Sequence, residues 1–265
     1  MSTQRLTKTK KYLQTIAYKI LRCSMKSKEW NLHMKKALMK PHLEKSKQRV
    51  ENAYQKNAKY YDFAVKVFYP LMGLRIDEYR KKAVEYLNLN EGDFVIDLGC
   101  GTGLCFPLLM EKIGPNGKLI GIDISTEMLS IAEERVKSAG WSNVELIHSD
   151  IEEFKFPTEI NGLISTGVFG YLGKRTEVLE KIHKALANNG KIVIVDGKRP
   201  QKWPSFLFKL FVKLSSPYGL TESYFENDTS EIISRLFQNV TFEDLYGGLL
   251  YITAGEKHQN PKITN

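Results

Sequence analysis

The chain has 265 residues, of which 42% are hydrophobic and 26% are charged, as is typical of a globular domain with one core and an appendage. Its net charge of +9 is unevenly distributed. Residues 1–50 hold 14 of the 39 lysines and arginines and 2 of the 30 acids, so they carry +12 and the rest of the chain carries −3. This distribution excludes a nucleic-acid-binding domain that is basic throughout. It leaves a basic N-terminal arm that could bind an anionic partner.

Residues 1–48 are predicted to form a basic helical extension. Five apolar residues in it recur at helical spacing and make one stripe: Leu13, Ile16, Ala17, Ile20 and Leu21. Lysines flank this stripe. A basic amphipathic helix can lie on an anionic membrane, pack on its own core or bind another chain, and the sequence does not choose between these. We expect any membrane contact of the arm to involve residues 8–40.

The sequence also restricts the location of the protein. No stretch reaches the roughly 18–20 apolar residues that span a bilayer. The first apolar stretch is broken by charged residues and no small-residue cleavage site follows it, so no secretory signal is expected. Cys23, Cys100 and Cys105 are too few and too irregular for a disulfide framework or a metal site. We therefore expect a cytoplasmic protein without a metal, and membrane association stays open.

From residue 72 onward, helical and strand patterns alternate. Helices are predicted over residues 74–89, 103–113, 125–140 and 174–190, and strands over 93–99, 118–124, 144–150, 162–168 and 191–197. Ser125 is expected to cap the third helix and Gly140 to follow its end, and Gly190 is expected to close the fourth. Strands that alternate with helices in this way predict a parallel sheet covered on both faces.

The last third of the chain departs from this alternation. Residues 203–214 form a dense apolar segment with two lysines, and residues 230–237 favour a helix. Residues 239–255 indicate two strands around Gly247 and Gly248, which we expect to pair antiparallel at the sheet edge. Residues 257–265 form a polar tail.

A glycine-rich loop follows the first predicted strand, with Gly99, Gly101 and Gly103 spaced two apart. Ligands of such sheets bind beyond the carboxyl ends of the strands, where bare backbone allows close approach. A dinucleotide fingerprint would need a third glycine at position 104, which is Leu104, and a phosphate-binding P-loop would need a lysine that is absent here.

Acidic residues end the first three predicted strands: Asp97, Asp123 and Asp150. A carboxylate after the second strand can accept hydrogen bonds from both hydroxyls of a ribose. Together with the glycine loop, the three acids suit a ligand that combines an ammonium group, a ribose and an aminopurine. S-adenosylmethionine is such a ligand.

Four segments, taken in order, resemble the motifs of class I S-adenosylmethionine-dependent methyltransferases: VIDLGCGTG (95–103), GIDIS (121–125), SDIEEF (149–154) and ALANNGKIVIVDG (185–197). The similarity covers about residues 50–256 and looks closest to the branch of quinone C-methyltransferases and bacterial phosphatidylethanolamine N-methyltransferases. The Tyr-Asp segment of that branch, which caps the cofactor, is similar to residues 60–74. The basic arm is not explained by the resemblance.

The resemblance implies an enzyme with a Rossmann-like α/β fold, a seven-stranded and mostly parallel sheet with an antiparallel edge hairpin, in a domain over residues 49–256 with a lid inserted at about 199–230. S-adenosylmethionine would be the donor and S-adenosylhomocysteine the product. The implied donor-binding residues are Asp97, Gly99, Cys100, Gly101, Thr102, Gly103, Asp123, Ile124, Met128, Asp150, Ile151 and Thr166. Asp97 would act on the amino group, Asp123 on the ribose, and Thr166 would lie near the sulfonium.

The sequence says less about the acceptor. Methyl transfer from a sulfonium depends mainly on alignment and desolvation, and no catalytic base is evident. Residues that could line an acceptor pocket are Tyr60, Tyr61, Tyr171, Asp196 and Lys198. In the lid, Trp203, Phe206, Phe208, Leu210 and Phe211 form an apolar wall, a membrane-facing patch or a buried helix.

Three functional hypotheses remain. The first is a methyltransferase that acts on a small or lipid-like acceptor, at a membrane surface or away from one. The second is an RNA-directed enzyme, since the arm could bind phosphates. Residues 165–172 lack the proline-containing motif typical of enzymes that methylate exocyclic amines of nucleobases. The third is a cofactor-binding interaction subunit without activity, which the intact glycine and acid pattern disfavours. The oligomeric state is not predicted.

Overall fold

The computed structural model describes residues 58, 60–71, 73–216 and 220–258, all within one compact unit of the chain. The predicted basic extension over residues 1–48 lies outside these residues, as does the end of the predicted tail from residue 259. In the part of the chain that is described, no helix combines the length and apolar character needed to cross a membrane.

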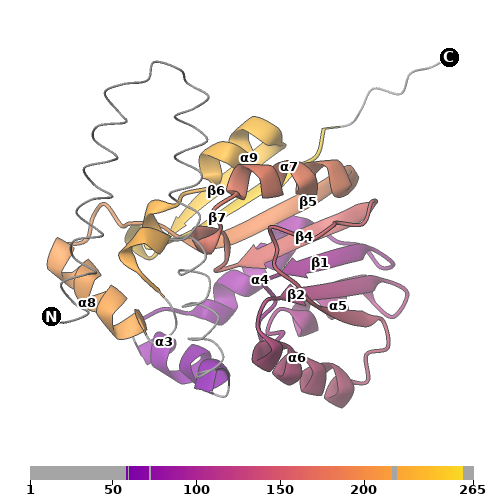
Figure 1. The fold of residues 1–265 in the computed structure, drawn as a ribbon, viewed down its shortest axis with the longest axis horizontal. Coiled ribbons are helices and arrows are strands. Elements are labelled where there is room, and N and C mark those ends of the chain that lie inside the picture. Colours follow the sequence, from indigo (N-terminus) through magenta and orange to yellow (C-terminus); the bar gives the residue numbers. More distant parts are fainter. Residues whose placement is uncertain (1–57, 59, 72, 217–219, 259–265) are drawn as a thin grey trace, which may run out of the picture. The chain divides into compact units, whose positions relative to one another are not determined.

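A seven-stranded sheet forms the centre of the domain (Figure 1). Its strands are β1 (Phe94–Leu98), β2 (Lys118–Asp123), β3 (Val144–His148), β4 (Ile160–Thr166), β5 (Leu186–Gly197), β6 (Gln238–Leu245) and β7 (Leu250–Glu256). They lie in the order β3-β2-β1-β4-β5-β7-β6. The first five pair in parallel, and β7 is antiparallel to both β5 and β6. The predicted sheet with an antiparallel edge pair is confirmed.

Helices cover both faces of the sheet. One face packs against α4 (Ile76–Leu87), α5 (Phe106–Ile113) and α6 (Thr126–Ala139), and the other against α7 (Arg175–Ala185) and α9 (Ser230–Leu236). Successive strand residues point to opposite faces, so Val95 joins the first of these cores and Ile96 the second. Both are fully buried, which explains why the central strand β1 is mainly apolar on both faces.

The predicted ends of α6 are confirmed. The Ser125 hydroxyl accepts a hydrogen bond from the backbone N–H of Met128 at 3.3 Å, which satisfies a donor that the first turn leaves open. Gly140 follows the helix with a φ of 70°, in the left-handed region that glycine tolerates.

The predicted end of α7 was wrong. The helix stops at Ala185, and Gly190 lies inside β5 rather than at the helix terminus. The tertiary structure overrides the helical pattern because Leu186 already pairs with Ile160 of β4. Gly190 serves a different purpose, since a Cβ there would lie 2.7 Å from the Ile160 carbonyl oxygen.

A third apolar cluster lies beyond the carboxyl ends of the parallel strands. It is built by short elements that are far apart in sequence: η1 (Ala64–Phe68), α3 (Tyr69–Leu71), η2 (Phe169–Tyr171), α8 (Ser205–Ser215), η4 (Glu222–Glu226) and η5 (Tyr246–Gly248). Figure 1 shows α3 and α8 on the side toward which the arrows of β1 and β4 point. The segment predicted over 203–214 is therefore an amphipathic helix, with Phe208 and Phe211 buried in this cluster and Phe206 and Leu210 exposed.

Candidate functional site

The glycine loop crosses from the end of β1 to the end of β2. The N–H groups of Gly99 and Cys100 both donate to the carbonyl oxygen of Ile122, at 2.7 and 3.0 Å. Gly99 has a φ of 75°, and a Cβ on it would lie 2.2 Å from Val168 Cγ2. Only glycine fits this combination of backbone conformation and close approach. The loop therefore presents bare backbone at the topological switch between β1 and β4.

Asp123 connects the two strand ends. Its Oδ2 accepts a hydrogen bond from Gly101 N at 2.8 Å, and its Oδ1 accepts one from Ser125 N at 2.9 Å. Burial raises the pKa of this carboxyl, and the backbone donors oppose the increase. A carboxylate can accept about four hydrogen bonds, so two further acceptor positions remain for a ligand.

Asp97 has a different environment. Its side chain is only 1% exposed, and neither carboxylate oxygen accepts a hydrogen bond from any described residue. Burial raises the pKa of Asp97 to about 7, the Arg80 guanidinium opposes the increase, and the Asp123 carboxylate adds to it. A buried carboxylate without a partner is costly, and such groups concentrate at functional sites.

Arg80, on α4, is a second buried charge with unused hydrogen-bonding groups. It is 4% exposed, its Nε and Nη1 make no hydrogen bond within the described chain, and its nearest acid is Asp77, 3.6 Å from Nη1. The sequence-based prediction missed this residue. A signal was present, because Arg80 occupies an apolar-stripe position of its helix, four residues after Ile76 and three before Ala83.

The segment ahead of α4 is fastened to the glycine loop. Thr102 Oγ1 donates to Asp62 Oδ1 at 2.6 Å, and Arg135 Nη2 pairs with Asp62 Oδ2 at the same distance. Arg135 Nε also donates to the carbonyl of Thr102 at 2.9 Å. Asp62 therefore holds the Tyr-Asp segment against the loop, and this partnership joins residues too distant in sequence to be recognised as a motif.

The remaining residues predicted to bind a donor follow β1, β2 and β3. Met128 and Ile151 are buried, Ile124 is partly buried, and Asp150 Oδ1 accepts from Glu152 N at 2.9 Å. Cys100 is buried, and its Sγ would lie 3.0 Å from a Cβ on Gly121, so it is a small packing residue. Among the residues that the structure describes, no cluster could hold a metal ion.

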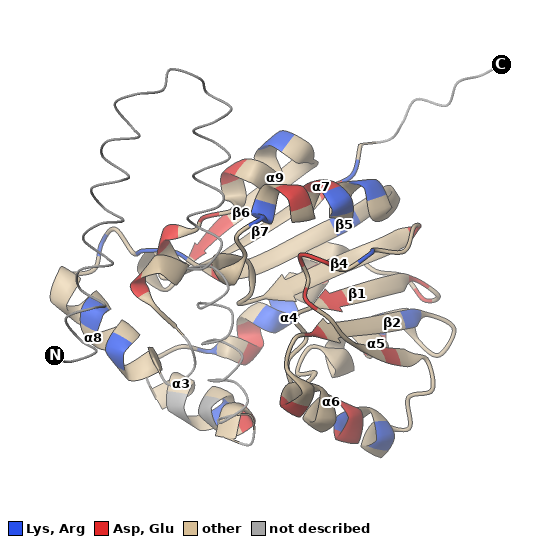
Figure 2. Cartoon of the chain, in the orientation of Figure 1, with Lys and Arg blue, Asp and Glu red and all other residues tan. Residues whose placement is uncertain are grey.

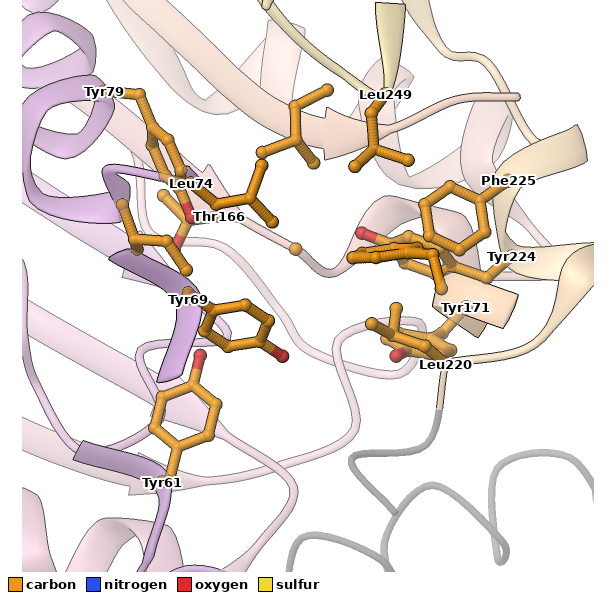
Figure 3. A pocket seen from close by; sticks show the side chains of 14 residues that line it. Tyr61, Tyr69, Leu74, Tyr79, Thr166, Tyr171, Leu220, Tyr224, Phe225 and Leu249 are labelled. Carbon is orange, nitrogen blue, oxygen red and sulfur yellow. The ribbon is translucent and has the colours of Figure 1, made fainter. Parts of the chain in front are cut away.

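A cavity of about 110 Å³ opens beside the end of β4. Figure 3 shows Tyr61 and Tyr69 on one side of it, and Tyr171, Tyr224 and Phe225 on the other. The described residues that line it are Tyr61, Tyr69, Leu74, Ile76, Tyr79, Thr166, Gly167, Tyr171, Phe211, Leu220, Tyr224, Phe225, Leu249 and Leu250. Half of these residues are aromatic and none is charged, so the cavity suits a ligand with apolar, planar character.

The structure brings only some of the predicted acceptor residues to the cavity. Tyr61 and Tyr171 line it, together with Thr166, which was predicted to lie near the sulfonium of the donor. Tyr60 is 65% exposed and does not line it. Lys198 also lies outside the lining, because its Nζ pairs with Asp244 at 2.7 Å. Asp196 is buried behind Tyr224, to which it is hydrogen-bonded.

The sequence of residues 89–242, more than half of the chain, matches the family described as a methyltransferase domain. The chain belongs to this methyltransferase family. It is a class I S-adenosylmethionine-dependent methyltransferase, as the motifs predicted. The prediction of an enzyme is thereby confirmed.

Relatives of this methyltransferase include two demethylmenaquinone methyltransferases. That of Bacillus velezensis is 28% identical over 81% of this chain and 99% of its own length. That of Listeria welshimeri is 32% identical over 46% of this chain, and the match spans about half of the relative, 52%. Among solved structures, phosphoethanolamine N-methyltransferase 2 of Haemonchus contortus aligns with a TM-score of 0.63 at 16% identity. The alignment covers 79% of this chain and 60% of the Haemonchus chain, and it shows that the two share a fold.

Proposed function

We propose that this methyltransferase methylates a small, amphiphilic ring compound of the quinol type. The observation that carries the proposal is the cavity at the end of β4, whose lining is aromatic and aliphatic without a charged side chain. Relatives named demethylmenaquinone methyltransferases support it. A phosphate-bearing acceptor such as phosphoethanolamine, or RNA, would require cationic partners, and none is present among the described lining residues.

The donor fits the residues at the strand ends. Gly99, Gly101 and Gly103 would pass under the methionine portion, and the unpaired carboxylate of Asp97 would bind its ammonium group. Arg80 would complete this end, since its Nε and Nη1 make no hydrogen bond to the described residues and a guanidinium suits the donor's carboxylate. Asp123 would bind the ribose through its remaining acceptor positions.

The rest of the donor would contact the neighbouring strand ends. Ile124 and Met128 would press on the adenine, while Asp150 and Ile151 would face its edge. Thr166 lines the cavity and would lie where donor and acceptor meet.

S-adenosylmethionine supplies an activated methyl group, so the protein's own contribution is placement. The lid proposed over residues 199–230 supplies Phe211, Leu220, Tyr224 and Phe225 to the cavity wall. These side chains would exclude water and hold the acceptor ring in line with the donor.

A labelled-donor assay tests the proposal. We expect the protein to bind S-adenosylmethionine in calorimetric titration and to transfer label to a short-chain demethylmenaquinol. Phosphoethanolamine at the same concentration should take up none. Label on phosphoethanolamine alone would refute the quinol assignment without affecting the donor site.

A lipid-like acceptor would be met at a membrane surface, and the described domain offers a face for this contact. We define the apolar face as the exposed side chains of α8 and of the segment before α4: Tyr60, Phe63, Val67, Leu71, Phe206, Leu207, Leu210 and Leu214. Both parts pack into the third apolar cluster, which also forms the cavity wall. Residues 199–214 contain four basic residues and no acid, and Figure 2 shows lysines and no acidic residue on α8. This composition suits anionic lipid.

Replacing Phe206 and Leu210 together with serine is expected to weaken sedimentation with phosphatidylglycerol-containing vesicles at least tenfold. Each large apolar side chain contributes about 1 kcal/mol or more on partial insertion, and 1.4 kcal/mol corresponds to a factor of ten. Phe242→Ser, an exposed aromatic on β6 outside the apolar face, serves as the matched control. A second comparison uses protein without residues 1–45. Unchanged binding in the serine variant combined with loss in the truncated protein would assign the contact to the basic arm instead.

A further inference from the structure

A buried tyrosine–carboxylate pair lies against the cavity and has no role in the proposed donor site. Tyr224, in η4, donates a hydrogen bond from its hydroxyl to Oδ1 of Asp196 at the end of β5. Both side chains are buried, at 4% and 1% exposure. Tyr224 lines the cavity and Asp196 does not, so the carboxylate can act on a bound acceptor only through the tyrosine.

The Tyr224 hydroxyl lies at the carboxyl end of β4. A Cβ built on Gly167, the residue after Thr166, would be 3.9 Å from Tyr224 Oη. Thr166 and Gly167 both line the cavity. The hydroxyl is therefore placed beside the position at which donor and acceptor are proposed to meet.

The ring of Tyr224 is held in one orientation by two glycines. A Cβ on Gly170 would lie 2.4 Å from Tyr224 Cδ2, and a Cβ on Gly197 would lie 2.6 Å from Cε1. The Tyr171 ring packs on the same residue, with centroids 4.6 Å apart. A hydroxyl that is fixed in this way is suited to proton transfer over a short distance.

The carboxylate of Asp196 is also fixed in position, by hydrogen bonds to both of its oxygens. Its Oδ2 accepts from Gly170 N at 2.8 Å, and its Oδ1 accepts from Gly197 N at 2.8 Å as well as from Tyr224. Two further ionisable groups among the described residues lie near Asp196: Tyr251 of β7 and Arg175 of α7. Tyr251 is hydrogen-bonded to Thr229, and Arg175 Nη1 donates to the carbonyl of Leu172, so neither occupies the carboxylate.

We propose that Tyr224 is a catalytic residue that takes a proton from the acceptor's hydroxyl while passing its own proton to Asp196. This inference rests on the proposed function, because it requires an acceptor that arrives protonated. The O–H bond of the acceptor breaks and a new O–H bond forms on Tyr224 Oη. At the same time the original Tyr224 O–H bond breaks and its proton binds Asp196 Oδ1.

The electron pair and the negative charge remain on the acceptor, which becomes the stronger nucleophile. The negative charge of the pair falls by one unit, and Asp196 returns its proton to solvent through Tyr224 after the product leaves. Asp196 acts through Tyr224 and is the positioning residue of the pair. Burial raises the pKa of Asp196 to about 6, while Tyr224 and the backbone donors oppose the increase, so the carboxylate is ionised at neutral pH.

The test measures kcat against pH from 5 to 8 with saturating S-adenosylmethionine and a short-chain demethylmenaquinol. If this quinol takes no label, the lipid fraction that the wild-type protein labels replaces it. We expect kcat of the wild-type protein to rise with pH through about 6, as Asp196 loses its proton. Tyr224→Phe should lower kcat about 10²-fold or more, within the range of general acid–base catalysis, and Asp196→Asn should remove the rise.

Two further measurements separate chemistry from folding. Calorimetric affinity for S-adenosylhomocysteine should be unchanged in Tyr224→Phe. The pH dependence of the free energy of unfolding, measured without donor, should show a higher pKa for Asp196 in this variant. The reason is that the Tyr224 hydrogen bond, which lowers the pKa of Asp196, is absent. Tyr251→Phe, which removes another buried hydroxyl outside the cavity lining, should retain wild-type kcat.

Wild-type kcat in Tyr224→Phe, or a wild-type kcat independent of pH between 5 and 8, would overturn the proposal while leaving the quinol assignment intact. The pH profile of the wild-type protein tests the relay even where a variant does not fold. Absence of label in every fraction would overturn the relay together with the proposed function.

Discussion

Replacing Asp123 with alanine is expected to weaken S-adenosylmethionine binding about 100-fold. The carboxylate would lose two hydrogen bonds to the ribose, each worth about 1.5 kcal/mol or more for a charged acceptor, and 1.4 kcal/mol corresponds to a factor of ten. The N–H groups of Gly101 and Ser125 would also lose their acceptor, which loosens the glycine loop. Calorimetric titration of the folded variant measures this loss.

Asp93→Ala is the matched control for this variant. Asp93 immediately precedes β1, at the strand end away from the glycine loop, and its Oδ2 likewise accepts a backbone hydrogen bond, from Asn90 N at 2.8 Å. We expect its donor affinity to stay within twofold of the wild type. The donor affinity of Asp123→Asn, which keeps one carbonyl oxygen, should lie between those of Asp123→Ala and Asp93→Ala. Equal affinities in Asp123→Ala and the wild-type protein would refute the ribose role.

Replacing Asp97 with asparagine is expected to make the donor-free protein less sensitive to pH while weakening donor binding 10- to 100-fold. The folded protein holds the proton of Asp97 up to a pH of about 7, whereas an unfolded aspartate loses it near 3.9. Stability contributed by this group is therefore present at low pH and is lost as pH rises from about 4 to 7. The difference corresponds to roughly 4 kcal/mol.

Chemical denaturation at pH 5 to 8 measures the first effect. The wild-type free energy of unfolding should fall across this interval more steeply than that of Asp97→Asn, and Glu111→Gln, which changes an exposed acid on α5, should match the wild type. For the second effect, wild-type affinity for S-adenosylhomocysteine should rise between pH 5.5 and 7.5, because the bound ammonium favours the ionised carboxylate. The asparagine variant should lack this rise. Parallel stability curves for wild type and variant would show that Asp97 is ionised throughout.

Local sequence patterns were sufficient to predict much of the fold. The alternation of strands and helices, the cap at Ser125 and the glycine after α6 each depend on neighbouring residues, so they could be predicted from the sequence. The end of α7 could not, because strand pairing of Leu186 with Ile160 decides it. The donor site that we propose could be predicted from motifs for the same reason, since the glycines and Asp97 lie on one strand and the loop after it.

The acceptor side depended on distant contacts. Tyr224 comes from a short helix with no motif, and the role that we propose for it depends on Asp196, 28 residues earlier in the chain. Asp62 reaches Thr102 over 40 residues, and Lys198 turns away to Asp244. Arg80 could have been noticed as a charged residue in an apolar stripe, but only the structure shows that it is buried and that its Nε and Nη1 make no hydrogen bond to the described residues.

The sequence by itself determined the family, the donor and the parallel sheet, because these are encoded in short segments whose residues act on the backbone next to them. The tertiary structure alone decided which side chains form the cavity that we propose for the acceptor. That cavity lies at the ends of the strands and is lined from α3, η2, α8 and η4, which are far apart in sequence and are brought together only when their apolar faces pack. The basic charge of the first 50 residues is likewise set by sequence, whereas the apolar face on α8 exists because packing buries Phe208 and Phe211 and leaves Phe206 and Leu210 exposed.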